Sequence, residues 1–252
     1  MICTCIGNCS VEKCISSLKG LKAAEVRLDL LSGAVGKEEV RRIFSSRKNL
    51  IATCRSGKFS QSECASLLLE AISAGAAYID IEVSTPHSTT QVRKPLSSER
   101  GGAPGRGFPF CNTSPGLQAW VVDALRRKLV AAAKKAGCKV IISFHDFEKT
   151  PARAKLEALV AKCFHAGADI AKIACKANSP EDCARLLSLL DGKGKLAVVA
   201  MGKKGRLVRV VAPLLGSAIA YASPAGKRGT ADGQMPAAEL EKAQRMILHG
   251  IN

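Results

Sequence analysis

Residues 139–146 read Lys-Val-Ile-Ile-Ser-Phe-His-Asp, and residues 169–174 read Asp-Ile-Ala-Lys-Ile-Ala. Each is a short apolar run bounded by polar residues, which is typical of a buried strand. Similar runs recur along the chain, and the apolar residues between them have helical spacing, as at Leu67, Leu68 and Ile72. The expected strands cover residues 2–6, 24–28, 50–54, 78–82, 139–143, 170–174, 196–200 and 217–221. Strands that alternate with helices in 252 residues predict an α/β protein, a single (β/α)8 TIM barrel formed by residues 1–252.

The composition favours a globular protein with anionic partners. The chain is 47% hydrophobic, and its 38 Lys and Arg against 21 Asp and Glu give a net charge of +17. Such a charge attracts anionic small molecules or nucleic acid. The longest uncharged apolar stretch, residues 210–226, is broken by prolines and serines. Because the first ten residues also lack a secretory pattern, we expect a cytoplasmic protein without membrane association.

The eleven cysteines are odd in number and scattered, so we expect reduced thiols. Their density at Cys3, Cys5, Cys9 and Cys14 leaves a metal or iron–sulfur site as an alternative. The spacing matches neither zinc sites nor ferredoxin clusters. We therefore interpret them as small core residues and expect no metal site there.

One segment departs from the alternation of strands and helices. Residues 84–116, after the fourth strand, contain five Pro, five Gly, five Ser and four Thr. The segment is basic, and its composition cannot form a buried core. We expect a flexible basic insertion, with a role as a lid or in nucleic-acid binding as the alternative.

The second expected strand carries charges toward the barrel interior. Side chains alternate along a strand, so Glu25, Arg27 and Asp29 share one face while Val26 and Leu28 share the other. Burying Glu25 and Arg27 costs free energy unless they pair or meet a ligand. They are candidate functional residues, and a purely structural ion pair is the alternative.

The strand at residues 170–174 predicts a buried amine. Lys172 projects into the barrel with Ile170 and Ala174 if the intervening residues face helices. Burial and nearby arginines would lower the pKa of Lys172, and a neutral amine can attack a ketone to form an imine. The alternative is a structural lysine neutralised by Asp169 or Glu82.

His145 is the candidate proton shuttle. It ends the strand that begins at residue 139, at the carboxyl face where barrel enzymes place their active sites. A histidine titrates near neutral pH and can act as acid and base. The other three histidines lie in the insertion, at a helix end and near the carboxyl terminus.

Several motifs occur in order along the chain. They are Glu25-Val-Arg27-Leu-Asp29, Thr53-Cys-Arg55-Ser, Ser143-Phe-His145-Asp-Phe, Ala168-Asp-Ile-Ala-Lys172-Ile-Ala and Met201-Gly-Lys-Lys-Gly-Arg-Leu-Val-Arg209. In this set the chain resembles type I 3-dehydroquinate dehydratase over nearly its whole length, apart from the first residues and the insertion.

The resemblance implies a (β/α)8 barrel and a lyase of the shikimate pathway of aromatic amino acid biosynthesis. This family dehydrates 3-dehydroquinate to 3-dehydroshikimate through a Schiff base, without a cofactor. By resemblance, Lys172 would form the imine and His145 would be the proton shuttle. The implied partner is a small anionic substrate, and a homodimer is left open as the assembly. The implied substrate-binding residues are Glu25, Arg27, Arg55, Met201, Arg209, Thr230 and Gln234, with Arg209 clamping the carboxylate.

The chain departs from the family at two site positions. The family usually has a Glu four residues after the arginine of Thr-x-Arg, where it orients the histidine, and this chain has Phe59. Glu82, Glu63 or a water would have to replace it, and we favour Glu82. The family's Ser-Ala-Pro-Gly-Gln loop is here Thr-Ala-Asp-Gly-Gln, which adds a negative charge at Asp232 near an anionic substrate.

Two other functions compete with this interpretation. A class I aldolase or transaldolase also uses a barrel lysine, and residues 202–205 could bind the phosphate of a sugar. A basic nucleic-acid-binding protein on an inactive barrel would explain the net charge, but one Trp and two Tyr offer few stacking surfaces. We therefore expect no nucleic-acid partner.

Overall fold

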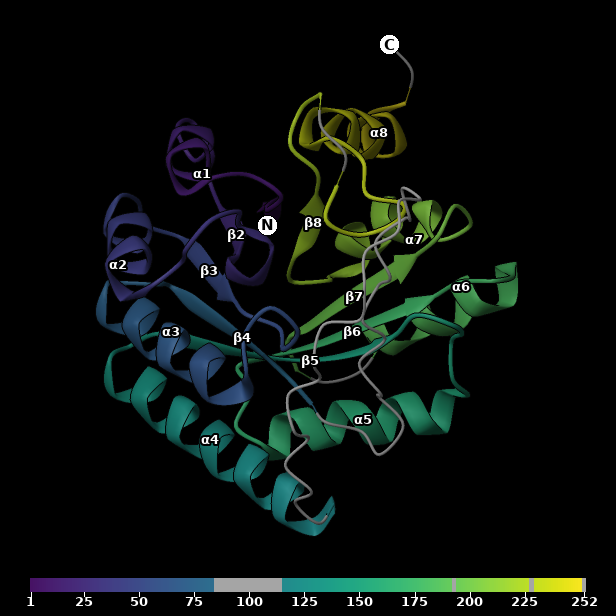
Figure 1. Ribbon diagram of the computed structural model, residues 1–252. Coiled ribbons are helices and arrows are strands. Elements are labelled where there is room, and N and C mark those ends of the chain that lie inside the picture. Colours follow the sequence, from purple (N-terminus) through teal and green to yellow (C-terminus); the bar gives the residue numbers. More distant parts are fainter. Residues whose placement is uncertain (84–114, 192–193, 227–228, 251–252) are drawn as a thin grey trace, which may run out of the picture.

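The computed structural model describes residues 1–83, 115–191, 194–226 and 229–250, and it is a barrel of parallel strands surrounded by helices (Figure 1). All eight predicted strands are present. The strands are β1 (Ile2–Ile6), β2 (Ala24–Arg27), β3 (Leu50–Thr53), β4 (Tyr78–Glu82), β5 (Lys139–Asp146), β6 (Ile170–Lys176), β7 (Leu196–Met201) and β8 (Ala220–Ala222). The main differences are that β5 is longer than expected and that β8 begins three residues later, after the Gly216 turn.

Helices follow the strands in the order expected for a (β/α)8 barrel. They are α1 (Val11–Ser17), α2 (Lys37–Ser45), α3 (Gln61–Ser73), α4 (Pro115–Lys135), α5 (Arg153–His165), α6 (Pro180–Leu187), α7 (Arg206–Val211) and α8 (Ala237–His249). The described residues also contain three short 3-10 helices, η1 (Leu28–Leu30), η2 (Ser188–Asp191) and η3 (Ala212–Leu215). Within the parts of the chain described, none of the helices is long and apolar enough to cross a membrane.

The sheet runs in the order β7-β6-β5-β4-β3-β2-β1-β8, and every pair of neighbours is parallel. Its two ends meet at β7 and β8. There, Ala218 N donates to Leu196 O at 2.7 Å and Val198 N donates to Ser217 Oγ at 3.0 Å. A serine side chain thus supplies one of the hydrogen bonds that join the ends of the barrel.

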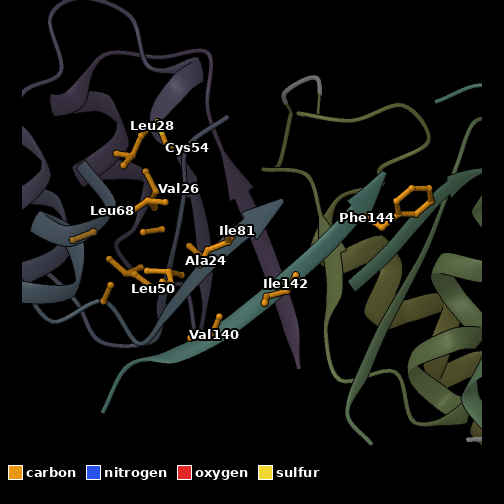
Figure 2. Close-up of a cluster of buried hydrophobic side chains, with 14 of the residues drawn as sticks. Ala24, Val26, Leu28, Leu50, Cys54, Leu68, Ile81, Val140, Ile142 and Phe144 are labelled. Atoms are coloured by element: carbon orange, nitrogen blue, oxygen red, sulfur yellow. The ribbon is translucent and has the colours of Figure 1, made fainter. Parts of the chain in front are cut away.

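The buried hydrophobic residues of the described chain form three clusters, and the two largest lie on the two sides of the sheet. The outer core lies between the sheet and the helices, where Val140, Ile142 and Phe144 of β5 alternate along one face (Figure 2). The inner core contains Ile170 and Ala174 of β6, whereas Ala171 and Ile173 belong to the outer one. Because the side chains alternate in this way, Lys172 projects into the barrel, as the sequence predicted.

The predicted insertion lies almost entirely outside the described residues. Residues 84–114 are not described, and α4 begins at Pro115, so it includes the last two residues of the expected insertion. The prediction that residues 84–116 are flexible stays a prediction for the remainder.

Candidate active site

Four side chains from alternate strands form one layer across the barrel interior. They are Glu25 of β2, Asp80 of β4, Lys172 of β6 and Tyr221 of β8, and each of these residues is no more than 6% exposed. In a (β/α)8 barrel the even-numbered strands supply one such layer of four. Here the layer consists of a cation, two carboxylates and an aromatic ring instead of the aliphatic residues that usually fill it.

Lys172 is held by the two carboxylates of this layer. Its Nζ lies 2.9 Å from Asp80 Oδ2 and 3.5 Å from Glu25 Oε1. Neither partner proposed from the sequence takes this place, because Asp169 accepts a hydrogen bond from Val140 N at 2.7 Å and Glu82 contacts His145. The hypothesis that a carboxylate neutralises Lys172 is therefore confirmed, but the choice of Asp169 or Glu82 as that carboxylate was wrong.

The charge state expected for Lys172 is also corrected. Burial favours the neutral amine, but the negative charges of Asp80 and Glu25 outweigh it, so the pKa of Lys172 is raised. The positive charge of Arg55 opposes them only in part. Lys172 is therefore an ammonium ion, and it must lose a proton before it can act as a nucleophile.

Asp80 links the lysine to its surroundings. Its Oδ1 accepts hydrogen bonds from Arg55 Nη2 at 2.8 Å and from Ser143 Oγ at 2.6 Å, while Oδ2 accepts from Lys172. Burial raises the pKa of this carboxyl, but the charges of Arg55 and Lys172 dominate and hold it well below its ordinary value. Asp80 is thus a buried carboxylate with two cationic partners.

His145 lies on the strand next to Lys172, one layer nearer the carboxyl ends of the strands. Its Nδ1 is 2.7 Å from Glu82 Oε1. Phe59 packs against the outer core, and Glu63 caps α3 by accepting from Ser60 N at 2.7 Å. Of the two glutamates considered as replacements, Glu82 is therefore the one in contact with the histidine.

The pKa values of this pair shift in the same direction. Burial lowers the pKa of His145, and the contact with Glu82 opposes this only in part, so the imidazole is neutral near pH 7. Burial alone would raise the pKa of Glu82, but Arg55 and His145 bring it to about 2. The site therefore combines a neutral imidazole with an ionised carboxylate.

Arg209 has a buried guanidinium that uses only some of its N–H groups in hydrogen bonds. Its Nη2 donates to Asp232 O at 3.0 Å. Its Nε and Nη1 are buried and have no hydrogen-bond partner in the described part of the chain. Burial lowers the pKa of Arg209 to about 10, so the group stays charged at neutral pH. A buried donor pair without a partner indicates a place for an anionic ligand.

The remaining predicted residues lie around this centre. Thr230 Oγ1 donates to Gln234 Oε1 at 3.3 Å, and Gln234 Nε2 lies 3.2 Å from Cys5 Sγ. Met201 is buried at the carboxyl end of β7. Arg27 pairs with Asp29 at 2.6 Å, so part of its hydrogen-bonding capacity is already used.

Several residues of the site were not predicted from the sequence. Asp80 and Tyr221 belong to the layer of four, Ser143 supports Asp80, and Thr53 Oγ1 donates to Glu25 Oε1 at 2.8 Å. Asp80 did carry a signal, because it lies two residues before Glu82 in an apolar strand and must share its face. Thr53 and Ser143 begin two of the motifs quoted above, but nothing in the sequence indicated their roles in the site, and Tyr221 could not be distinguished from an ordinary core residue.

The amino-terminal cysteines do not form a cluster of ligands. Cys3 and Cys5 face the inner core, whereas Cys14 packs in the outer core. Among the described residues, no group of three or more His, Cys, Asp and Glu side chains is placed to hold a metal ion. Cys5 instead donates to Glu25 Oε2 at 3.1 Å and so contacts the layer that holds Lys172.

The comparisons with known proteins agree on one family. The model of the type I 3-dehydroquinase family matches residues 2–101 and 117–250. A 3-dehydroquinate dehydratase of Methanocaldococcus jannaschii is 30% identical over 98% of this chain and 99% of that protein. One from Methanosarcina acetivorans is 45% identical, but the match spans only about half of each protein, 48% of this chain and 52% of the relative. The crystal structure of the 3-dehydroquinate dehydratase from Aquifex aeolicus superimposes with a TM-score of 0.69 at 26% identity over 100% of both chains.

Proposed function

The chain belongs to the type I 3-dehydroquinase family, and we propose that it dehydrates 3-dehydroquinate to 3-dehydroshikimate through an imine on Lys172. The observation that carries the proposal is the position of Lys172. It is the one lysine with a buried side chain among the described residues, and a neutral histidine lies one layer above it on the adjacent strand. A ketone that enters from the carboxyl ends of the strands meets both groups.

Imine formation begins with a proton transfer. The Lys172 ammonium gives a proton to neutral His145, directly or through the substrate, and the free amine attacks C3 of the substrate. The carbinolamine then loses water with a proton from His145. Asp80 and Glu25 stabilise the cationic iminium as they stabilise the ammonium, since both species carry one positive charge on the same nitrogen.

Elimination follows at the neighbouring carbons. The iminium withdraws electrons and acidifies C2, so a base as weak as neutral His145 can remove the C2 proton. The electron pair moves toward the nitrogen and then expels the C1 hydroxyl, which leaves as water with the proton from His145. Water hydrolyses the remaining imine, which restores Lys172 and releases the enone, so that the net change is the loss of one water.

Arg209 is proposed to bind the substrate carboxylate. Its unpartnered Nε and Nη1 offer two N–H groups in the planar arrangement that a carboxylate accepts. A carboxylate is more suitable here than the sugar phosphate of an aldolase, because Lys204, which could have served a phosphate, donates to Asn178 O at 2.7 Å. The net charge of +17 would draw such an anion toward the protein.

The test combines an assay with covalent trapping. Turnover of 3-dehydroquinate is followed by the absorbance of the enone product. Borohydride is then added during turnover, and the peptides are analysed by mass spectrometry. We expect a reduced adduct on Lys172, and neither turnover nor an adduct in Lys172→Ala. Turnover without modification of Lys172, or activity in Lys172→Ala, would overturn the mechanism.

A further inference from the structure

The ring of Tyr221 faces the reacting nitrogen. Lys172 Nζ lies 4.0 Å from the centroid of this ring, well within the range of a cation–π contact. Tyr221 is 4% exposed and belongs to β8, which pairs with β1 in the barrel. It is the one member of the layer of four that carries no charge at neutral pH.

The hydroxyl of Tyr221 does not explain why the residue is there. This oxygen is buried and has no hydrogen-bond partner among the described residues. A buried phenol usually finds a partner, and leaving it without one costs free energy. The feature of Tyr221 that does make a specific contact is the face of its ring.

The contact matters because Lys172 is a buried cation. The groups that face it are Asp80 of β4, Glu25 of β2, Arg55 after β3, His145 of β5 and the thiols Cys3 and Cys5 of β1, while β7 has only apolar residues. Asp80 and Glu25 attract the ammonium, and Arg55 repels it. The negative face of the ring adds attraction from β8 without adding another charged group, because burial raises the pKa of the Tyr221 phenol and keeps it neutral.

We propose that Tyr221 is a positioning residue that holds the Lys172 nitrogen in its cationic forms through the face of its ring. The catalytic consequence of this proposal rests on the proposed function, because the iminium forms only in that reaction. The iminium carries the same charge as the ammonium. The ring would stabilise both cations relative to the neutral amine. A cation–π contact that is shielded from water is strong enough to shift the pKa of Lys172 by about one pH unit.

The experiment changes the ring face and leaves its shape almost constant. Position 221 is replaced by Phe and then by phenylalanines with one, two and three fluorine atoms on the ring. Each fluorine makes the electrostatic potential at the ring face less negative. The pKa of Lys172 is measured in the free enzyme by NMR of labelled lysine, with Lys172→Ala to assign the signal. Tyr221→Leu provides an aliphatic comparison.

We expect the Tyr221→Phe variant to keep the pKa of Lys172 and each added fluorine to lower it, with Tyr221→Leu about one pH unit below Tyr221→Phe. The amount of borohydride-trapped imine should fall in the same order. A pKa that is independent of fluorination would overturn the proposal, even if Tyr221→Leu failed to fold. The NMR series needs no substrate, so absence of a trapped adduct in the wild type would refute the proposed function while leaving this test intact.

Discussion

Glu82 Oε1 and His145 Nδ1 are 2.7 Å apart, at the carboxyl ends of the adjacent strands β4 and β5. Because the pKa of Glu82 is lowered to about 2, its carboxylate accepts the hydrogen bond and Nδ1 carries the proton. This tautomer leaves the lone pair on Nε2, which is the atom that would take a proton from a substrate. The pair thus fixes both the orientation and the protonation of the histidine.

We predict that Glu82→Gln lowers kcat by at least about tenfold, since loss of a carboxylate that fixes a histidine tautomer can cost up to about 10⁴. Phe59→Glu should change kcat little, because Phe59 packs against the outer core and Glu82 already contacts His145. The measurement is the steady-state rate of enone formation. A large loss in Phe59→Glu together with normal activity in Glu82→Gln would contradict the assignment.

The pH profile separates this role from a general loss of structure. Burial lowers the pKa of His145 and Glu82 partly opposes it, so removing the charge of Glu82 should lower that pKa further. The acid limb of kcat/KM, where His145 becomes protonated in the free enzyme, should therefore move to lower pH in Glu82→Gln. An acid limb that stays in place or moves to higher pH would show that Glu82 does not act through His145.

His145→Ala should separate proton transfer from imine formation. General acid–base catalysis is worth about 10² to 10⁴ in rate, so kcat should fall by that factor. Imine formation should continue slowly because Lys172 and its carboxylates are untouched. Mass spectrometry after borohydride should therefore still find the adduct on Lys172. An unchanged kcat would refute the role of His145.

Asp80→Asn tests whether the layer of four also stabilises the fold. The substitution leaves the buried Lys172 and the partly buried Arg55 with one carboxylate fewer, so the free energy of unfolding should fall by about 3 to 5 kcal/mol. Because the pKa of Asp80 is lowered in the folded state, the stabilisation is present above its unfolded pKa and is lost as the pH falls. Urea unfolding at neutral and acidic pH measures both effects.

Asp191→Asn is the matched control, because Asp191 pairs with Arg153 on the surface and its side chain is 64% exposed. Exposed ion pairs contribute little to stability. If the two variants lost similar stability, the buried position of Asp80 would have no special importance. The Asp80→Asn difference should also narrow at low pH, where the wild-type carboxylate loses its advantage.

The eight strands could be predicted because buried parallel strands are short apolar runs, and Lys172 and His145 because a charge in such a run is conspicuous. The carboxylate partners of Lys172 could not be predicted, because they depend on which strands face each other across the barrel. Asp169 is close in sequence but bonds Val140 N, whereas Asp80 is 92 residues away in the chain. The predicted direction of the Lys172 pKa shift was wrong for the same reason, since Asp80 and Glu25 were not known to meet there.

Gly233 allows the loop that carries Gln234 to lie on the end of β7. Its φ is +78°, and a Cβ at this position would be 2.7 Å from Gly202 O. Gly233→Ala should therefore displace the loop and raise KM, as measured by initial rates. Gly226→Ala is the control, because φ is +63° there but a Cβ would meet nothing within 4 Å. An equal rise in KM in both variants, relative to the wild type, would show that backbone strain, and not the contact with Gly202, governs the loop.

Arg209→Lys tests the proposed carboxylate clamp. Lysine keeps the positive charge but loses the planar pair of N–H groups, and Arg209 Nε and Nη1 are the two atoms without a partner in the described structure. A hydrogen bond to a charged group contributes about 1.5 to 3 kcal/mol, so KM should rise by roughly tenfold or more. A substrate analogue without the carboxylate should bind more weakly than the substrate, and this loss should be far larger in the wild type than in Arg209→Lys. If the variant and the wild type lost equal affinity for an analogue without the carboxylate, Arg209 would not be the residue that binds it.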